Sequence, residues 1–271
     1  RTLYDIYEEG SLPWKWHQEL FDLANKIGLV CFSSPFDFSA VDFLENLNTP
    51  IYKIASPEIT DIPLIEYVAK KGKPIIISTG MATYGDIELA VKTCRSVGNN
   101  KITILKCTSS YPTPIEETNL LMMQQYKNDF NVDVGVSDHT LGLTVPLTAV
   151  AMGAKVIEKH FIIDKNIGGL DSSFSLDINE FKKMVNEVRS VEKSMGKISY
   201  KLTKKQILSR QFARSLYVSN DIKKGETITK HNIKSIRPGL GLHPKYYDDV
   251  LGMKAVKNLE KGTRLSFKLL I

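Results

Sequence analysis

The sequence has 271 residues, of which 42% are hydrophobic and 24% are charged. That length and composition suffice for one large domain with a small second one, and they exclude a globally disordered chain. The net charge of +6 is spread along the sequence, and the basic run at 201–205 has few aromatic residues near it. The charge pattern therefore indicates a solvated linker and a site for a small anion, not a nucleic-acid surface.

Three cysteines, Cys31, Cys94 and Cys107, show no metal-binding spacing, and two of them lie in apolar runs. This usage is typical of reduced core residues in a cytoplasmic protein. No apolar run approaches the roughly 20 residues of a membrane span. The sequence carries no signal peptide, and it starts at Arg1 without a methionine, so we expect the natural N-terminus to lie further upstream.

The chain begins with a polar stretch, 1–12, that predicts a loop. A helical pattern follows from Pro13 and is closed by Gly28. Short apolar runs that turn polar at their ends then alternate with amphipathic helices. Six strands are expected, at 29–36, 50–56, 74–80, 102–112, 132–140 and 154–161.

Alternation of apolar strands with helices predicts a parallel sheet covered by helices. No Gly-x-Gly-x-x-Gly follows a first strand, and every strand ends in polar residues, which favours a (β/α)8 TIM barrel over an open doubly wound sheet. Six strands do not close such a barrel, so we expect two β/α units to precede Arg1. If that expectation is wrong, the fold is the open sheet.

A last barrel helix is expected at about 177–195, which makes 1–195 an N-terminally incomplete barrel domain. Residues 196–209 are predicted to be a linker. The segment 210–271 has short alternating runs and predicts a small, mostly β domain. Its turn KKGETI (223–228) is echoed by EKGTRL (260–265), which indicates an internal pseudo-repeat.

Two of the expected strands end in a histidine, His139 and His160. Imidazoles at the carboxyl ends of neighbouring strands can share one divalent metal, at the edge where a parallel barrel keeps its chemistry. The alternative for each is a hydrogen-bonded interior histidine.

The other polar strand endings are predicted to complete one ring around these histidines. Lysines, hydroxyls and a glycine-opened turn converging there would suit an oxyanion or a phosphate. Lys106 has a second interpretation, as the Schiff-base nucleophile of a class I aldolase. The ring consists of Lys53 and Ser56, Ser78 to Gly80, Lys106 to Tyr111, Ser137 to His139, and Glu158 to His160.

The order and spacing of seven motifs resemble the sialic acid synthase family over essentially the whole chain. That family condenses phosphoenolpyruvate with a 2-acetamido sugar, and its members carry an antifreeze-like (SAF) domain after the barrel. Two further segments, GGLDSSFSLD (168–177) and GLHPKYYDDVLG (241–252), are most similar to the pseudaminic acid branch. The seven motifs are SSPFD (33–37), YKIAS (52–56), IISTGM (76–81), KCTSSYP (106–112), SDHT (137–140), EKHF (158–161) and RPG (237–239).

The resemblance implies a role for each matching residue. His139 and His160 would bind a divalent metal, Mn²⁺ first and Mg²⁺ or Co²⁺ as alternatives. Arg237 would reach the active site of the other subunit in a domain-swapped homodimer, and Lys53, Glu158 and Arg237 would be catalytic. Phosphoenolpyruvate would be held by Lys53, Ser56, Ser78, Ser109 and Ser137, and the sugar by Phe36, Glu58, Tyr111, Glu158 and Asp171.

Three departures from the family pattern are visible. The first-strand glutamate and second-strand lysine have no counterpart here, Ser109 stands where asparagine is common, and Leu170 replaces a proline. The implied product is a nine-carbon 2-keto acid, pseudaminic acid, made from a 2,4-diacetamido-2,4,6-trideoxy hexose. N-acetylneuraminic or legionaminic acid synthesis, a 3-deoxy-sugar-phosphate synthase, the class I aldolase and a non-catalytic carbohydrate-binding protein remain alternatives.

Overall fold

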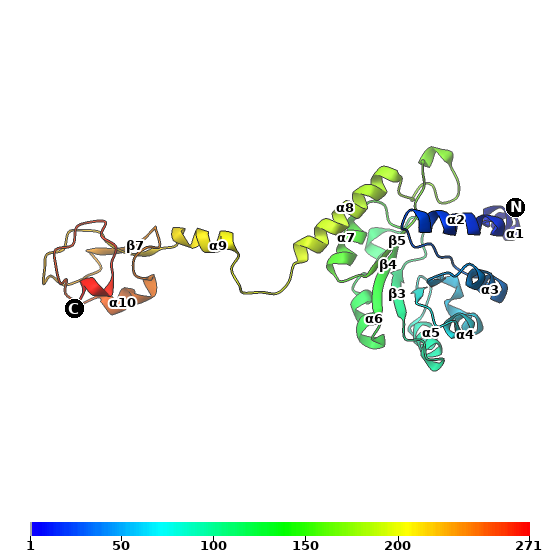
Figure 1. Ribbon diagram of the computed structural model, residues 1–271, viewed down its shortest axis with the longest axis horizontal. Helices are drawn as coiled ribbons and strands as arrows, with labels where there is room; N and C mark the ends of the chain where they lie inside the picture. The colour runs from blue at the N-terminus through cyan, green and yellow to red at the C-terminus, as the bar shows by residue number, and fades with distance from the viewer. Residues whose placement is uncertain (1) are drawn as a thin grey trace. The chain divides into compact units, whose positions relative to one another are not determined.

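The computed structural model describes residues 2–271, which fold into two compact units divided after Gly196 (Figure 1). The first unit is built on one five-stranded parallel sheet, in which the strands are neighbours in the order β1-β2-β3-β4-β5. Each strand pairs in register with the next one along the chain. The strands are β1 (Tyr52–Ile54), β2 (Ile75–Ser78), β3 (Ile102–Cys107), β4 (Asp133–Asp138) and β5 (Val156–Lys159).

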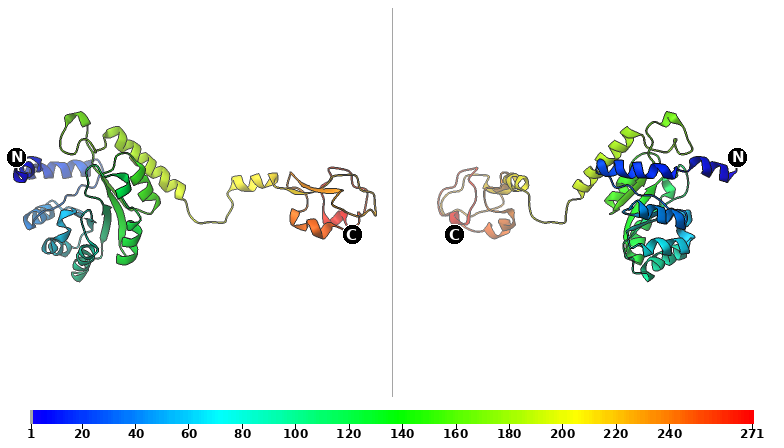
Figure 2. Two further views of the ribbon diagram at one scale, coloured as in Figure 1. Left: turned by 180° about the vertical axis from the view of Figure 1, so that it is seen from behind. Right: turned by 45° about the vertical axis from the view of Figure 1, so that its right-hand side comes forward.

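Helices connect and cover these strands (Figures 1 and 2). In this arrangement α6 packs on β3 and β4, and α7 packs on β4 and β5. Several helix starts are set by side-chain caps, such as the reciprocal Thr83–Asp86 capping box of α5. The helices of this unit are α1 (Leu3–Gly10), α2 (Trp14–Lys26), α3 (Phe38–Asn46), α4 (Ile62–Lys70), α5 (Tyr84–Ser96), α6 (Met122–Phe130), α7 (Thr144–Ala151) and α8 (Ile178–Met195).

Side chains alternate between the two faces of the sheet. Tyr52, Ile77 and Val136 point toward the helices and belong to one buried apolar cluster. Their chain neighbours point to the opposite, interior face, as the period of two in a strand requires. The interior face at the carboxyl ends of the strands is thereby left for polar side chains.

The predicted parallel sheet with helices is confirmed as a curved half-barrel, but two local predictions are wrong. Residues 29–36 form no strand; Ser33 makes a single parallel bridge to Tyr52. A segment paired along one side only, and by one residue, gains too few hydrogen bonds to make a regular strand. The polar start, predicted to be a loop, contains α1, which begins with a Thr2–Asp5 capping box.

The second unit, Lys197–Ile271, has its own apolar cluster and a short antiparallel pair, β6 (Ser215–Val218) with β7 (Ile233–Ile236). Gly225 and Gly262 both have positive φ at the two repeated Lys-Gly turns. The predicted linker contains a short helix, α9 (Lys204–Ser209), and a four-residue helix, α10 (Tyr247–Val250), follows later.

The net charge is divided unequally, so the expectation that it is spread along the chain is wrong. Residues 197–271 carry 17 lysines and arginines against 5 aspartates and glutamates, a net charge of +12, whereas residues 1–196 carry 19 against 25, a net charge of −6. All three cysteines are free. Within residues 2–271, no helix combines the length and apolar character that crossing a membrane would need.

Candidate active site

Lys53 is the cation of the interior face. Lys53 lies in β1, and only 7% of its surface is exposed. Its Nζ donates to Ser78 Oγ of β2 at 2.8 Å. Glu158 Oε2 of β5 lies 3.6 Å from the same Nζ. Burial lowers the pKa of Lys53, and the charge of Glu158 opposes that shift. A buried ammonium that a single carboxylate contacts only loosely is suited to receive an anionic ligand.

Gly80 forms the turn after β2 and has no room for a side chain. Its amide donates to Ser56 Oγ at 2.9 Å. A Cβ there would lie 2.8 Å from Ser56 Oγ and 2.9 Å from Cys107 Sγ, and closer still to Ser109 Oγ. The glycine therefore allows hydroxyls from the β1 and β3 ends to gather at one turn, as sequence reasoning expected of a phosphate cradle.

Glu158 joins the lysine side of the site to the histidine side. Its Oε1 accepts from Ser137 Oγ at 2.6 Å, and its Oε2 faces Lys53. Ser137 is the partner of Glu158 in the β4–β5 register. The carboxylate is thus held between an ammonium and a hydroxyl, with lone pairs left for a ligand.

His139 and His160 lie directly after β4 and β5, and their rings pack edge to face. Their ring centroids are 5.2 Å apart and the ring planes meet at 65°. The Nδ1 of His139 lies 3.1 Å from the carbonyl of Thr108, and the Nδ1 of His160 lies 3.4 Å from Asp171 Oδ2. With both Nδ1 atoms beside acceptors, the tautomer that these contacts favour leaves each Nε2 with a free lone pair.

These imidazoles fit a divalent metal in two respects. Burial lowers the pKa of both, which favours the neutral ring that coordinates a metal. Acceptors on Nδ1 are the usual orientation of a metal-binding histidine. No cluster of three or more His, Cys, Asp or Glu side chains suited to a metal occurs in the part of the chain described. The pair would supply two ligands, so water or substrate would have to supply the rest.

The loop after β3 holds His139 in place. Thr113 donates its amide to the His139 carbonyl at 3.0 Å, and its hydroxyl donates to the Thr108 carbonyl at 3.2 Å. Tyr111 in the same loop packs against His139, with centroids 4.3 Å apart and the rings tilted by 46°. Sequence reasoning missed Thr113, and it placed Thr108 in the ring without its backbone contact to His139, because a contact between separate loops leaves no sequence pattern.

An aromatic wall borders the histidines. Phe174 is 3% exposed and packs 5.0 Å from the His160 ring and 5.5 Å from the Tyr111 ring. The segment that carries it and Asp171 is tied to the β5 end, since Leu176 donates its amide to the His160 carbonyl at 2.9 Å. Phe174 therefore joins the predicted Tyr111 and Asp171 as a site residue.

Three further predicted site residues differ in exposure and location. Glu58 follows β1; burial raises its pKa, and its Oε2 is buried without a hydrogen-bond partner within residues 2–271. Phe36 is 63% exposed at the entry to α3. Arg237 is exposed at the end of β7 in the second unit. The roles of Phe36 and Arg237 stay predictions.

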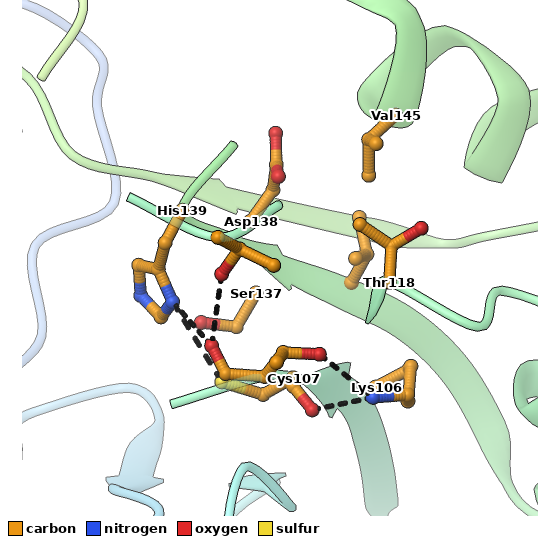
Figure 3. A pocket seen from close by; sticks show the side chains of 10 residues that line it. Lys106, Cys107, Thr118, Ser137, Asp138, His139 and Val145 are labelled. Carbon is orange, nitrogen blue, oxygen red and sulfur yellow. Dashed lines mark hydrogen bonds between the residues drawn. The ribbon is translucent and has the colours of Figure 1, made fainter. Parts of the chain in front are cut away.

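Several members of the predicted ring do not belong to it, among them Thr79, which lies beside Tyr126 of α6. Lys106, Asp138 and Lys159 point to the helix side of the sheet. Lys106 Nζ donates to the Cys107 carbonyl at 2.6 Å and to Thr108 Oγ1 at 3.1 Å (Figure 3). The reason is the period of two, which places every second residue of a strand on the opposite face. Lys106 is therefore badly placed to be a Schiff-base nucleophile for a ligand beside the histidines.

Comparison with known proteins agrees with this geometry. The profile of the NeuB family matches residues 1–200 and that of the SAF domain matches 213–271. The chain belongs to the NeuB family. The pseudaminic acid synthase of Helicobacter pylori is 49% identical over 98% of this chain and 78% of its own length.

A second relative and a solved structure are also similar to this chain. The N,N'-diacetyllegionaminic acid synthase of Campylobacter jejuni is 42% identical over 94% of the chain and 78% of its own length. The crystal structure of the spore coat polysaccharide biosynthesis protein SpsE from Bacillus subtilis superposes with a TM-score of 0.66 at 34% identity, covering 100% of this chain and 81% of that one. These neighbours confirm the predicted barrel class and the SAF unit.

Proposed function

We propose that this NeuB-family chain condenses phosphoenolpyruvate with a 2,4-diacetamido-2,4,6-trideoxy hexose, giving pseudaminic acid and phosphate. The observation that carries the proposal is one interior face on which Lys53 and a gathering of hydroxyls adjoin two imidazoles with free Nε2 atoms. The likeness to the Helicobacter pylori pseudaminic acid synthase supports it.

In the proposed reaction, C3 of phosphoenolpyruvate attacks the sugar aldehyde and forms the new C–C bond. Water adds at C2, and phosphate leaves with cleavage of its C–O bond. Lys53 with Ser56, Ser78, Ser109 and Ser137 would hold the phosphate and carboxylate, because buried donors offset their negative charge.

The sugar would lie on the histidine side. Tyr111, Asp171, Glu58 and Phe36 are assigned to it, and Glu158, in contact with both Lys53 and Ser137, is assigned the proton exchange between the two substrates. His139 and His160 would hold a divalent cation, Mn²⁺ first. When bound, such a cation supplies a Lewis acid that polarises the aldehyde.

The choice of a trideoxy sugar draws on Phe174. Its ring completes an apolar wall with Tyr111 beside His160. An apolar wall favours a methyl group over a hydroxyl, since an unpaired hydroxyl in such a place is costly. The legionaminic and N-acetylneuraminic acid synthases are the alternatives within the family.

We further assign a domain-swapped homodimer, in which Arg237 of one copy reaches the active site of the other. Free thiols and a substrate drawn from central metabolism support a cytoplasmic location.

An assay with full-chain protein, phosphoenolpyruvate and Mn²⁺ tests the proposal. With 2,4-diacetamido-2,4,6-trideoxy-altrose we expect equal release of phosphate and 2-keto acid. Reaction with N-acetylmannosamine but not with the altrose sugar would contradict the pseudaminic assignment. His139→Ala and His160→Ala should each abolish turnover, whereas His231→Ala, exposed in the second unit, should leave it unchanged. Borohydride trapping of substrate on Lys106 would favour the class I aldolase instead.

A further inference from the structure

Behind the histidines lies a buried ion pair that the proposed reaction does not use. Asp138 and Lys159 end β4 and β5, are partners in the strand register, and each exposes only 1% of its side chain. Lys159 Nζ donates to Asp138 Oδ2 at 2.6 Å. Charges this deeply buried are rare unless they are paired.

The pair and the site lie on opposite faces of the same two strands. Val136 and Ile157 precede Asp138 and Lys159 by two residues, share their face, and pack in the apolar cluster under the helices. In Figure 3 the carboxylate of Asp138 points away from the imidazole of His139. Each member of the pair thus immediately precedes one histidine without facing the ligand space itself.

The pair also fixes the backbone that follows His139. Asp138 Oδ1 accepts from the Thr140 amide at 2.8 Å, and Lys159 Nζ donates to the Thr140 carbonyl. Two charge-assisted hydrogen bonds from Lys159 therefore join the end of β5 to the residues on both sides of His139. A third, from the Thr140 amide to Asp138, ties those two residues to each other. Any slip or twist between the two strand ends would stretch these bonds and would turn the two imidazoles relative to each other.

Stability alone does not explain such a pair. A buried ion pair is often no more stabilising than apolar side chains of similar volume, because desolvation cancels much of the attraction. Unlike apolar contacts, the hydrogen bonds of an ion pair fix the relative orientation of the groups they join. We propose that Asp138 and Lys159 are positioning residues, which hold the neighbouring imidazoles of His139 and His160 in the relative orientation needed to share one cation. The cation itself rests on the proposed function.

The test compares two variants of the full chain with wild type. Lys159→Met leaves a buried carboxylate unpaired, so we expect a lower Tm. Asp138→Asn combined with Lys159→Met removes both charges and keeps the acceptor for Thr140, so we expect Tm to return close to wild type. Lys73→Met is the matched control, because it breaks a half-buried pair with Glu45 at 2.7 Å, far from the histidines in the sheet.

Two readouts separate positioning from stability. Mn²⁺ affinity, measured by electron paramagnetic resonance, should fall about 10- to 100-fold in the double variant despite its recovered Tm. Long-range ¹H–¹⁵N spectra of ¹⁵N-histidine-labelled protein, recorded without metal, should show His139 protonated on Nδ1 in wild type and a mixture of tautomers in the double variant. Lys73→Met should change neither.

Wild-type Mn²⁺ affinity together with a single His139 tautomer in the double variant would overturn the inference. Should the neutral pair fold poorly, Lys159→Arg, which keeps the charge but alters the donor geometry, is judged by the same two readouts. Absence of Mn²⁺ binding in wild type would contradict the proposed metal site instead, and the tautomer spectra would still decide whether the pair positions His139.

Discussion

At the scale of single residues, Gly80 shows how closely the strand ends approach. Gly80→Ala would place a methyl group among Ser56, Ser109 and Cys107. We expect a loss of about 1–3 kcal/mol in the free energy of unfolding, the usual cost of overpacking, together with weaker phosphoenolpyruvate binding. Denaturant unfolding and calorimetric titration measure the two effects.

Gly85→Ala is the control for that substitution. Gly85 lies in α5, where a Cβ would lie 3.8 Å from its nearest neighbour, Thr83 Oγ1. We expect this change to be neutral or stabilising by about 0.4–1 kcal/mol. Equal effects at both glycines would contradict the crowding inferred at the β2 turn.

The charge of Lys53 predicts a pH dependence. Burial lowers the pKa of Lys53, so its ammonium loses its proton at a lower pH than an ordinary lysine. The attraction for an anion is fully present below that pKa and is lost as pH rises through it. Phosphoenolpyruvate affinity should therefore decline as pH rises toward the ordinary lysine pKa of about 10.4, and earlier than an unperturbed lysine would allow.

Lys53→Met should bind phosphoenolpyruvate weakly at every pH, without the decline. Calorimetric titrations of both proteins measure the comparison. A wild-type affinity that stays constant up to pH 10 would show that the Lys53 ammonium is not what holds the anion.

At the scale of secondary-structure elements, α8 anchors the segment that carries Asp171 and Phe174. Its first turn is closed by a capping box, in which Asp177 accepts from the Asn179 and Glu180 amides and Glu180 accepts from the Asp177 amide. Asp177→Ala should lower the free energy of unfolding by about 1 kcal/mol. Asp177→Asn keeps an acceptor and should lose much less; equal losses in thermal unfolding would contradict a capping role.

The parallel sheet could be predicted because apolar runs and amphipathic helices alternate along the chain. The side of the sheet on which each strand residue's side chain lies could not be predicted. Strands buried on both sides are apolar throughout, so their pattern does not reveal which residues face the interior. This is why Lys106, Asp138 and Lys159 were predicted to belong to the ring. The order of β1 to β5 and the position of the two histidines after β4 and β5 agree with the prediction, and their role as metal ligands stays a prediction.

Helix α1 and the contact of Phe174 with His160 were missed for two other reasons. The Thr2–Asp5 spacing is a capping signature that does predict α1, and the polarity of the segment obscured it. The contact of Phe174 with His160 depends on how a long loop returns to the β5 end, which no local pattern specifies.

At the scale of the whole molecule, the division of charge between the units predicts how copies associate. A segment with a net charge of +12 and one of −6 attract each other. If the basic unit of one copy docks on the acidic unit of another, as the domain-swapped dimer requires, the dimer should weaken between about 50 and 500 mM salt, because screening shortens the range of attraction.

Sedimentation velocity at the two salt concentrations measures this association. A dimer that is indifferent to salt would show that apolar contacts, not the opposite charges, hold the copies together. A monomer under all conditions would contradict the assignment of Arg237 to the site of a second copy.

The most direct test of the site is anomalous diffraction at the manganese edge, from crystals of the full chain grown with Mn²⁺ and phosphoenolpyruvate. We predict one strong peak within bonding distance of the Nε2 atoms of His139 and His160, with the phosphate beside Lys53 and Gly80. A peak bound elsewhere, or imidazoles turned away from each other with no peak between them, would contradict it.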